Sequence, residues 1–460
     1  MPQKIKKFIL VTSIVLIFFI SSKSYAASPL IRDAEIEKFL HELSDPIFIA
    51  AGLNPKNITI YIVNDDSLNA FVSGGQNVFI HTGLIRKYKT PDALIGVIAH
   101  ESGHIAAGHL ARSSESAAKA ENAMLLSYLL GIGAMVGGSP AAGQALIMGG
   151  SQTAERLYMK FTREQEEAAD QYAIKYLDRL SYPAKGLIEL LEFFEQELVG
   201  YKGQIDEYLL SHPVSKKRID VIKARTADRN YSDKKINQKL QKSMDIALAK
   251  LEGFMENPDE IIRNYKNKYD DLSNYKKSIA FFKKGKVDSA LDLLNVLIDK
   301  KATENNQSEL GFLYELKGQM LFENGRIQDS IIAYNEALKL LDKKYSAQSK
   351  IAFSSAILAL KQNDQDLLNL SIKHLEEAKE FEDENPFLFR QLASAYSKIN
   401  DEGRSLLALA EFNLLIDQKD KAQKYAKDAK AKLNKLDKVN LIRADDLIDL
   451  TKKKDSKNDN

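Results

Sequence analysis

The chain is 460 residues long and nearly neutral, with 65 Lys and Arg against 63 Asp and Glu and a net charge of +2. This length is enough for two or three domains, each with a buried core. The balanced charge lacks the basic excess that nucleic-acid binding requires, so no nucleic-acid partner is expected. Cys is absent, which excludes disulfides and a Cys-linked lipid anchor. A metal site in this chain must use His and carboxylate side chains.

The first 26 residues have the pattern of a cleavable export signal. Three lysines within the first seven residues form a positive start, an uncharged apolar run covers residues 8–22, and small residues stand at Ser24 and Ala26. The alternative is an uncleaved membrane anchor, but the run is shorter than the ~20 residues that span a bilayer. We therefore expect cleavage after Ala26 and, in a bacterium, a mature protein in the periplasm.

The next sixty residues are predicted to contain a helix and a small sheet. Apolar residues at helical spacing indicate a helix over Ile31–Leu43, and the alternating, β-branched run Ile58–Val63 indicates a strand. Residues 69–80 have the pattern of a hairpin with Gly74-Gly75 at or near its turn. Beyond Gly83 the chain is predicted to be helical almost throughout.

One predicted helix has a clear start. Thr90 is expected to cap it, with Pro91 at its first position and an end near Arg112. The helices expected after it cover residues of about 155–180, 184–198 and 202–255.

The stretch Asn122–Ala154 contains no charged side chain. One interpretation is a membrane span or a re-entrant hairpin. Its many glycines and Pro140 disfavour a continuous span. The preferred interpretation is an apolar helix with a mobile loop that covers a functional site or makes peripheral contact with a bilayer.

From about Asp271 the sequence repeats with the pattern of tetratricopeptide units, which are helix hairpins of about 34 residues. Small residues stand where the two helices of a hairpin cross closely. The alternative is an ordinary helical bundle with Ala-rich contacts. The residues that carry the pattern are Gly285, Ala290 and Leu294; Gly318, Leu321, Gly325, Ser330, Tyr334 and Ala337; Ala393, Tyr396, Ser405, Leu409 and Phe412; and Ala422, Ala426 and Ala429.

The strongest chemical signal is the motif His100-Glu101-Ser102-Gly103-His104. Two His one helical turn apart share a face, so both imidazoles can bind one zinc ion. Glu101 lies about 100° round the helix from His100, beside a zinc-bound water whose pKa the metal lowers towards ~7. The motif predicts a zinc hydrolase with Glu101 as general base; the alternative is two surface His and a surface Glu.

The third zinc ligand must come from elsewhere, because a hydrolytic zinc usually has three protein ligands and one open position. His109 is nine residues beyond His100, or about 900° of helix, and is expected on the opposite face in a structural or ligand-supporting role. Glu166 and Asp170 are one turn apart on a later helix. Such an acidic run is more often a solvated surface, but together with the upstream motif it favours Glu166 as ligand and Asp170 as partner of a ligand His.

The motif His100–His104 followed by Glu166-x-x-Ala169-Asp170 resembles the gluzincin metallopeptidases that include HtpX, the CAAX prenyl endopeptidases, and the Oma-type and periplasmic BepA-type proteases. The resemblance covers residues from about 30 to 225, and the export signal and repeats make the whole architecture similar to the BepA-type branch. Thr162 stands where the family usually has Ser. The segments that agree are Asn69-Ala70-Phe71, Gly74-Gly75, Val78-Phe79-Ile80, Thr82-Gly83-Leu84, His109, Ser211-His212-Pro213 and Arg218-Ile219.

The resemblance implies one zinc ion per chain and roles for several residues. Glu101 is implied as general base and Asp170 as the residue that holds a ligand. His212 and Arg218 would steady the substrate carbonyl or the oxyanion. Alternatively, His212 enters the open zinc position and holds the enzyme off, or it is a helix-start residue packed near the site. The implied zinc ligands are His100, His104 and Glu166.

Together these observations predict a mainly α protein: a gluzincin-type helical metallopeptidase domain with a small β-hairpin or sheet, followed by an α-solenoid of tetratricopeptide-like repeats. Val78-Phe79-Ile80 is expected at the sheet edge, where an extended substrate adds as a strand. The parts expected are a signal peptide at 1–26, the peptidase domain at 27–255, a linker at 256–270, repeats at 271–451 and a polar tail at 452–460.

The resemblance implies a zinc endopeptidase that degrades misfolded or stalled outer-membrane proteins, and a monomer is expected. The repeats would bind these unfolded substrates or the outer-membrane barrel assembly machinery, and they suggest chaperone activity. One alternative is a repeat scaffold or chaperone with a largely latent protease domain. Another is a membrane-integrated protease, if both apolar segments stay in the bilayer.

Overall fold

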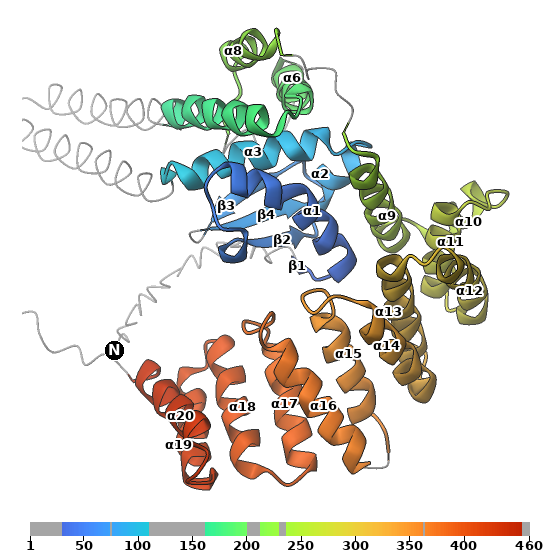
Figure 1. The fold of residues 1–460 in the computed structure, drawn as a ribbon, viewed down its shortest axis with the longest axis vertical. Helices are drawn as coiled ribbons and strands as arrows, with labels where there is room; N and C mark the ends of the chain where they lie inside the picture. Colours follow the sequence, from blue (N-terminus) through green and yellow to red (C-terminus); the bar gives the residue numbers. More distant parts are fainter. Residues whose placement is uncertain are drawn as a thin grey trace, which may run out of the picture.

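The computed structural model describes residues 30–73, 76–109, 162–199, 212–229, 236–361 and 364–452. The predicted export signal, the Gly74-Gly75 turn and the uncharged stretch of residues 122–154 lie outside these residues. Over the described residues the chain is mainly helical with one small sheet (Figure 1), so the predicted fold class is confirmed.

The sheet in the N-terminal part is built from β1 (Leu30–Ile31), β2 (Thr59–Val63), β3 (Ala70–Ser73) and β4 (Asn77–His81). The strands lie in the order β1-β2-β4-β3. β3 and β4 form the predicted antiparallel hairpin, and β4 also pairs parallel with β2. Residues 78–80 therefore lie inside the sheet, and the prediction that they form its edge is wrong. The edge on that side is β3.

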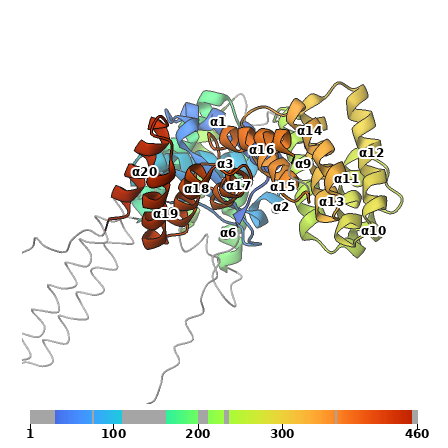
Figure 2. The ribbon, with the colours of Figure 1, turned by 90° about the horizontal axis from the view of Figure 1, so that it is seen from below.

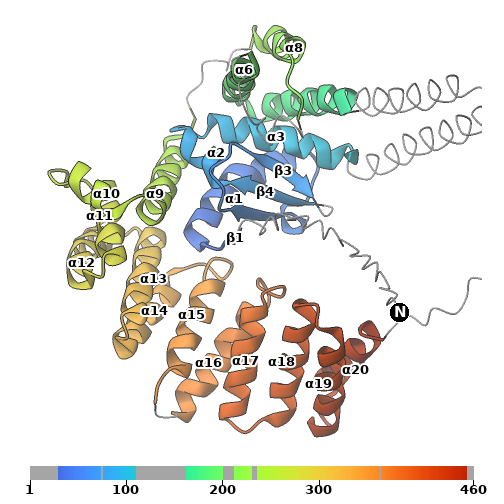
Figure 3. The ribbon, with the colours of Figure 1, turned by 180° about the vertical axis from the view of Figure 1, so that it is seen from behind.

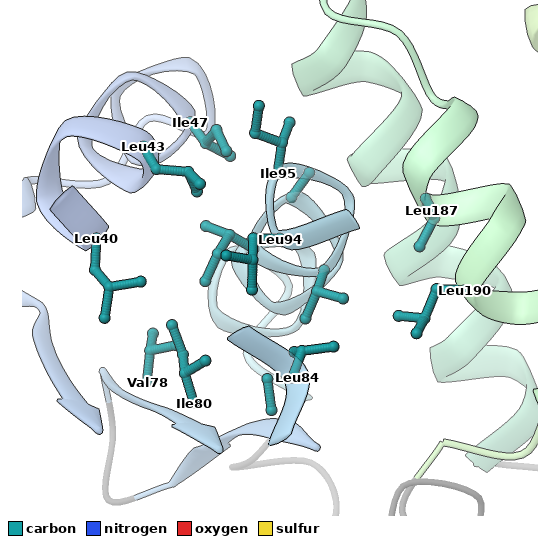
Figure 4. Close-up of a cluster of buried hydrophobic side chains, with 14 of the residues drawn as sticks. Leu40, Leu43, Ile47, Val78, Ile80, Leu84, Leu94, Ile95, Leu187 and Leu190 are labelled. Carbon is teal, nitrogen blue, oxygen red and sulfur yellow. The ribbon is translucent and has the colours of Figure 1, made fainter. Parts of the chain in front are cut away.

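The helices of this part are α1 (Ala34–Ala50), α2 (Thr82–Lys87), α3 (Asp92–Ala106), α6 (Lys185–Val199), α8 (Lys216–Thr226) and α9 (Gln238–Met255), and residues 162–180 form another helix. α3 lies at the centre, with α1 and the sheet on one side and α6 on the other (Figure 4). Every residue from Ala93 to Gly103 is buried. This burial on all sides explains why the helix is apolar almost throughout, apart from its chemical motif.

Both ends of α3 differ from the prediction. Pro91 stands at the N-cap without a side-chain cap hydrogen bond, so the expected Thr90 cap is not formed. The helix ends at Ala106 rather than near Arg112. Gly108 has φ of +65°, a left-handed conformation that suits Gly and that commonly ends helices.

The C-terminal half is a row of helices in which consecutive helices pack against each other. Gly285 and Gly325, with φ of +72° and +80°, reverse the chain inside the first two helix pairs. The row curves beneath the N-terminal part in Figures 1 and 3, and Figure 2 shows it from below. Its helices are α10 (Pro258–Asn264, inside the predicted linker), α11 (Asp271–Lys283), α12 (Val287–Thr303), α13 (Gln307–Glu323), α14 (Ile327–Leu340), α15 (Ala347–Leu358), α16 (Gln365–Ala378), α17 (Pro386–Lys398), α18 (Glu402–Leu415), α19 (Lys419–Lys432) and α20 (Lys438–Leu450).

Hydrogen bonds from Tyr275 and Arg32 join the two halves, next to a buried ion pair of the N-terminal part. Within the N-terminal part, Lys250 of α9 is only 3% exposed, and its Nζ lies 3.2 Å from Glu35 Oε2 of α1. The Tyr275 hydroxyl of α11 donates to the same oxygen at 2.6 Å. Arg32 donates from both Nη atoms to the carboxylate of Glu382, at 3.0 and 2.5 Å. Because buried charges are tolerated only with partners, these contacts fix how the halves meet.

The helix pairs depend on small residues at their crossings, and Gly318 tests this. A Cβ added to Gly318 would lie 2.6 Å from Cδ1 of the buried Tyr334 ring. We expect Gly318→Leu to lower the free energy of unfolding by about 1–3 kcal/mol through overpacking. Glu323→Leu, at an exposed position on the same helix, is the control in urea unfolding. Equal stability of the two variants would contradict the expected close crossing.

Candidate metal centre

Two helices carry five of the predicted site residues, and a glycine lets these helices approach. α3 supplies His100, Glu101 and His104, while the helix of residues 162–180 supplies Glu166 and Asp170.

Where these helices meet, a Cβ added to Gly103 would lie 2.9 Å from the carbonyl oxygen of Ala169 and 3.0 Å from its Cα. A larger residue at this position would therefore push the backbones of the two helices apart. Glycine in the fourth position of the motif sets the distance between the two sets of ligands.

Three side chains converge with the spacing that zinc requires. The Nε2 atoms of His100 and His104 are 3.1 Å apart. Glu166 Oε2 lies 3.3 Å from His100 Nε2, and Glu166 Oε1 lies 3.3 Å from His104 Nε2. Atoms that bind one tetrahedral zinc at its usual bond lengths lie roughly 3.3–3.5 Å apart. Two imidazole nitrogens and a carboxylate at this spacing fit a zinc ion.

His212 belongs to the same cluster. One candidate ligand atom from each of His100, His104, Glu166 and His212 lies within 4.8 Å of the others. His212 is 5% exposed, with Nδ1 3.1 Å from Glu166 Oε1 and Nε2 3.5 Å from Glu101 Oε1. His212 is therefore positioned as a fourth candidate ligand and as a neighbour of Glu101.

Asp170 and Arg218 orient the candidate ligands through hydrogen bonds and ion pairs. Asp170 Oδ1 lies 3.0 Å from His100 Nδ1, the ring nitrogen turned away from Glu166. Arg218 donates to Asp170 from Nε at 2.7 Å and from Nη2 at 2.9 Å. Its Nη1 lies 2.9 Å from Glu166 Oε2 and donates to Pro213 O at 2.8 Å. Because all three guanidinium nitrogens already have partners, this geometry favours Arg218 as a positioning residue over a contact to substrate.

The charges and the burial of the cluster shift the pKa values of several of its side chains. Burial alone would raise the pKa of Asp170, but hydrogen bonds from Arg218 and His100 hold it below its usual value. Burial alone would lower the pKa of His100, but the Glu166 and Asp170 carboxylates outweigh burial and raise that pKa to about 10. Burial lowers the pKa of His104. Without metal, His100 therefore carries a proton at neutral pH.

His109 does not lie on the opposite face, as the sequence predicts, but against a ligand. Its Nδ1 is 3.0 Å from Nδ1 of His104, and its carbonyl accepts a hydrogen bond from Gln165 at 3.1 Å. The rotation of 100° per residue applies only within a helix, and α3 ends at Ala106. Gly108 then turns the chain back, which brings the His109 ring next to Nδ1 of His104.

Comparison with known proteins places this geometry in a family. Residues 31–226 match the profile described as Peptidase family M48. These residues form a peptidase family M48 domain. They include each of the clustered residues described above, from His100 to Arg218. The predicted metallopeptidase family is thus confirmed.

The M48 domain is similar to proteins named beta-barrel assembly-enhancing protease. Identity to the Escherichia coli (strain K12) protein is 28% over 227 residues, which is 49% of this chain and 44% of the relative. Identity to the Yersinia pestis protein is 29% over 194 residues, 42% of this chain and 40% of the relative. Mitochondrial metalloendopeptidase OMA1 of Saccharomyces cerevisiae is 31% identical over 167 residues, 35% of this chain and 45% of the relative. The chain thus spans less than half the length of these curated relatives.

No helix within the described ranges is long and apolar enough to cross a bilayer. The predicted membrane contact of residues 122–154 falls outside those ranges and stays a prediction.

Zinc binding should release protons. Zinc must displace the proton that His100 carries at a pKa of about 10, so affinity should rise as the pH increases towards that value. We expect roughly one proton from His100 to be released per zinc at pH 8. Titration calorimetry of metal-free protein in two buffers of different ionisation enthalpy measures this number. Heats that do not depend on the buffer would contradict the assigned protonation.

Proposed function

We propose that this protein is a zinc-dependent endopeptidase of the bacterial periplasm that cleaves misfolded or stalled polypeptides. The M48 domain supports the reaction class, and the name of the similar beta-barrel assembly-enhancing proteases supports outer-membrane protein assembly as the setting. The observation that carries the proposal is the buried cluster of His100, His104 and Glu166 at zinc spacing, with Glu101 beside it.

Glu101 is the proposed general base. It is 1% exposed, and its Oε1 accepts no hydrogen bond from any of the described residues. A buried carboxylate oxygen without a donor is costly unless it has a task. Placed one residue after His100, it can take the proton of the attacking water and pass it to the leaving amine. Because the site is buried, the carboxylate acts in a low dielectric, where its charge has a strong effect.

The remaining residues hold this arrangement in place. Bound zinc would polarise the scissile carbonyl and lower the pKa of the attacking water. Asp170 fixes the tautomer of His100, so that Nε2 is free to bind metal. Arg218 of α8 binds both Asp170 and Glu166 and balances their negative charge. His109 supports His104 in the corresponding way, through the ring nitrogen away from Glu166.

The outer edge of β3, which pairs with no other strand among the described residues, is the proposed binding site for an extended substrate. β3 pairs with β4 on one side, packs near α3, and forms an end of the sheet. An extended polypeptide can pair with such an edge through its main chain. This mode of binding selects unfolded segments over particular sequences, as an enzyme that removes misfolded proteins requires.

The helical row is proposed to bind protein partners as an α-solenoid of tetratricopeptide-like repeats. Its curved succession of helix pairs matches that architecture. The expected partners are unfolded substrates and the outer-membrane barrel assembly machinery. Chaperone activity, a monomeric state and export by cleavage after Ala26 remain predictions from the sequence.

Glu101→Gln tests the enzyme. The change removes the base but leaves the three proposed ligands, so we expect zinc content to be kept and cleavage of casein to fall by about 10²–10⁴-fold. Cleavage followed by gel electrophoresis and metal content by atomic absorption give the two readouts. The control is Glu167→Gln, an exposed carboxylate on the helix of Glu166 that pairs with Lys217.

Unchanged cleavage by Glu101→Gln would rule out the proposed mechanism. If neither variant nor parent cleaves but both bind unfolded protein, the repeat scaffold with a latent protease domain becomes the better description.

His212 is proposed as a latch on the metal. Its place in the ligand cluster supports this role over that of a substrate contact, because a fourth protein ligand would fill the position that catalysis leaves open. The alternative roles predicted from the sequence, a contact to the oxyanion or a packed helix-start residue, lead to different outcomes on substitution.

His212→Ala separates these roles. Removal of a latch opens the metal, so we expect cleavage of casein to rise several-fold. An oxyanion contact predicts a fall instead, and a packed residue predicts no change in rate. His41→Ala, which removes a histidine of α1 paired with Asp45, controls for loss of an imidazole elsewhere. An unchanged or lower rate would count against the latch.

A further inference from the structure

A second concave site lies beyond the metal centre, where the helix of residues 162–180 meets the end of α8. This basic pocket has a volume of about 510 Å³. Its lining includes four cations and a single anion, Asp178, and the buried side chain of Ile174 also lines it. The cations are Lys175, Arg179, Arg225 and Arg229.

The partners of these cations leave them able to bind a ligand. Arg229 pairs with Asp178 at 2.9 Å, but both side chains are substantially exposed, so the pair contributes little. Arg225 donates to the uncharged amide of Gln171, and Arg179 donates to a backbone carbonyl at the end of α1. Lys175 has no hydrogen-bond partner among the residues that the structure describes.

These cations partly compensate the negative charge at the ends of helices, but their positive charge exceeds it. The C-termini of α1, of α8 and of the helix that ends at residue 180 come together here. Each carries a partial charge of about −0.5. These ends and Asp178 together leave an excess of roughly one and a half positive charges in the pocket. The excess is close to the charge of a phosphate group near neutral pH, about −1.5 to −2.

We propose that the basic pocket binds a phosphate group. Arginine presents a planar fork of donors that matches phosphate oxygens, and Arg179, Arg225 and Arg229 offer three such forks around one cavity. Free phosphate and a phosphate-bearing lipid headgroup share this chemistry. Ile174 adds an apolar surface beside it.

The pocket is separate from the metal centre, although both lie along the same pair of helices. Arg225 follows Arg218 by two turns of α8, about 10 Å of rise. None of the residues that line the pocket belongs to the candidate ligand cluster. The proposal therefore does not rest on proteolysis, and loss of the Glu101 base should leave phosphate binding unchanged.

The test is titration calorimetry of inorganic phosphate into the full-length, zinc-loaded protein, with sodium chloride at equal ionic strength as reference. We expect Arg225→Gln and Lys175→Gln each to weaken phosphate binding by about 10-fold or more, because each removes a charged donor. The matched control is Lys223→Gln, on the same helix as Arg225 but paired with Glu192. Both test positions are exposed, and thermal unfolding checks that the variants fold.

Vesicles distinguish the source of the phosphate. Sedimentation with phosphatidylglycerol vesicles, but not with phosphatidylcholine, that is lost in Arg225→Gln supports a lipid headgroup. Phosphate binding without vesicle binding supports free phosphate. The proposal is overturned if phosphate heats equal those of chloride, or if Arg225→Gln and Lys175→Gln bind as tightly as the parent. Undiminished binding in these variants would place the anion elsewhere, for example at the metal.

Discussion

The metal centre depends on how closely two helix backbones approach at Gly103. The ligands sit on different helices, and their donor atoms must lie within a few tenths of an ångström of one spacing for a zinc ion to be held. Backbone contact at Gly103 and Ala169 fixes that spacing without relying on flexible side chains. The glycine contributes no chemistry, yet it determines whether Glu166 reaches the two imidazoles.

The second constraint is electrostatic. Glu101, Glu166 and Asp170 are each at most 2% exposed, and three buried carboxylates would repel one another without positive charge. Arg218 supplies that charge to Glu166 and Asp170 through every nitrogen of its guanidinium. Glu101 is left outside this network. The carboxylates that hold the site are thus neutralised, while the one proposed to accept a proton is not.

The spacing of residues along the sequence predicts which side chains lie together when they belong to one helix. The pair His100 and His104 follows from one helical turn, and the pair Glu166 and Asp170 follows from another. The mainly helical fold and the hairpin of β3 and β4 were also predictable, because their patterns are local. His109 was misplaced, because the estimate extended a helix that stops at Ala106, although Gly108 was a readable stop signal.

Other features depend on contacts between distant segments. The insertion of β4 between β2 and β3 arises from a parallel pairing that no local pattern encodes. The two-residue strand β1 was missed, since it exists only through its pairing with β2. The basic pocket could not be foreseen either. Lys175 and Arg225 are fifty residues apart and look like ordinary surface charges until the two helices lie side by side.

The contact between Arg32 and Glu382 has a consequence for how the molecule is made. The two residues are 350 positions apart. A ribosome that adds 5–20 residues per second needs roughly 20 to 70 seconds to cover that distance. During this interval Arg32 exists without the carboxylate that binds both of its Nη atoms in the finished molecule. The contact between the N-terminal residue and the row of helices can therefore form only after the segment between α16 and α17 has been made.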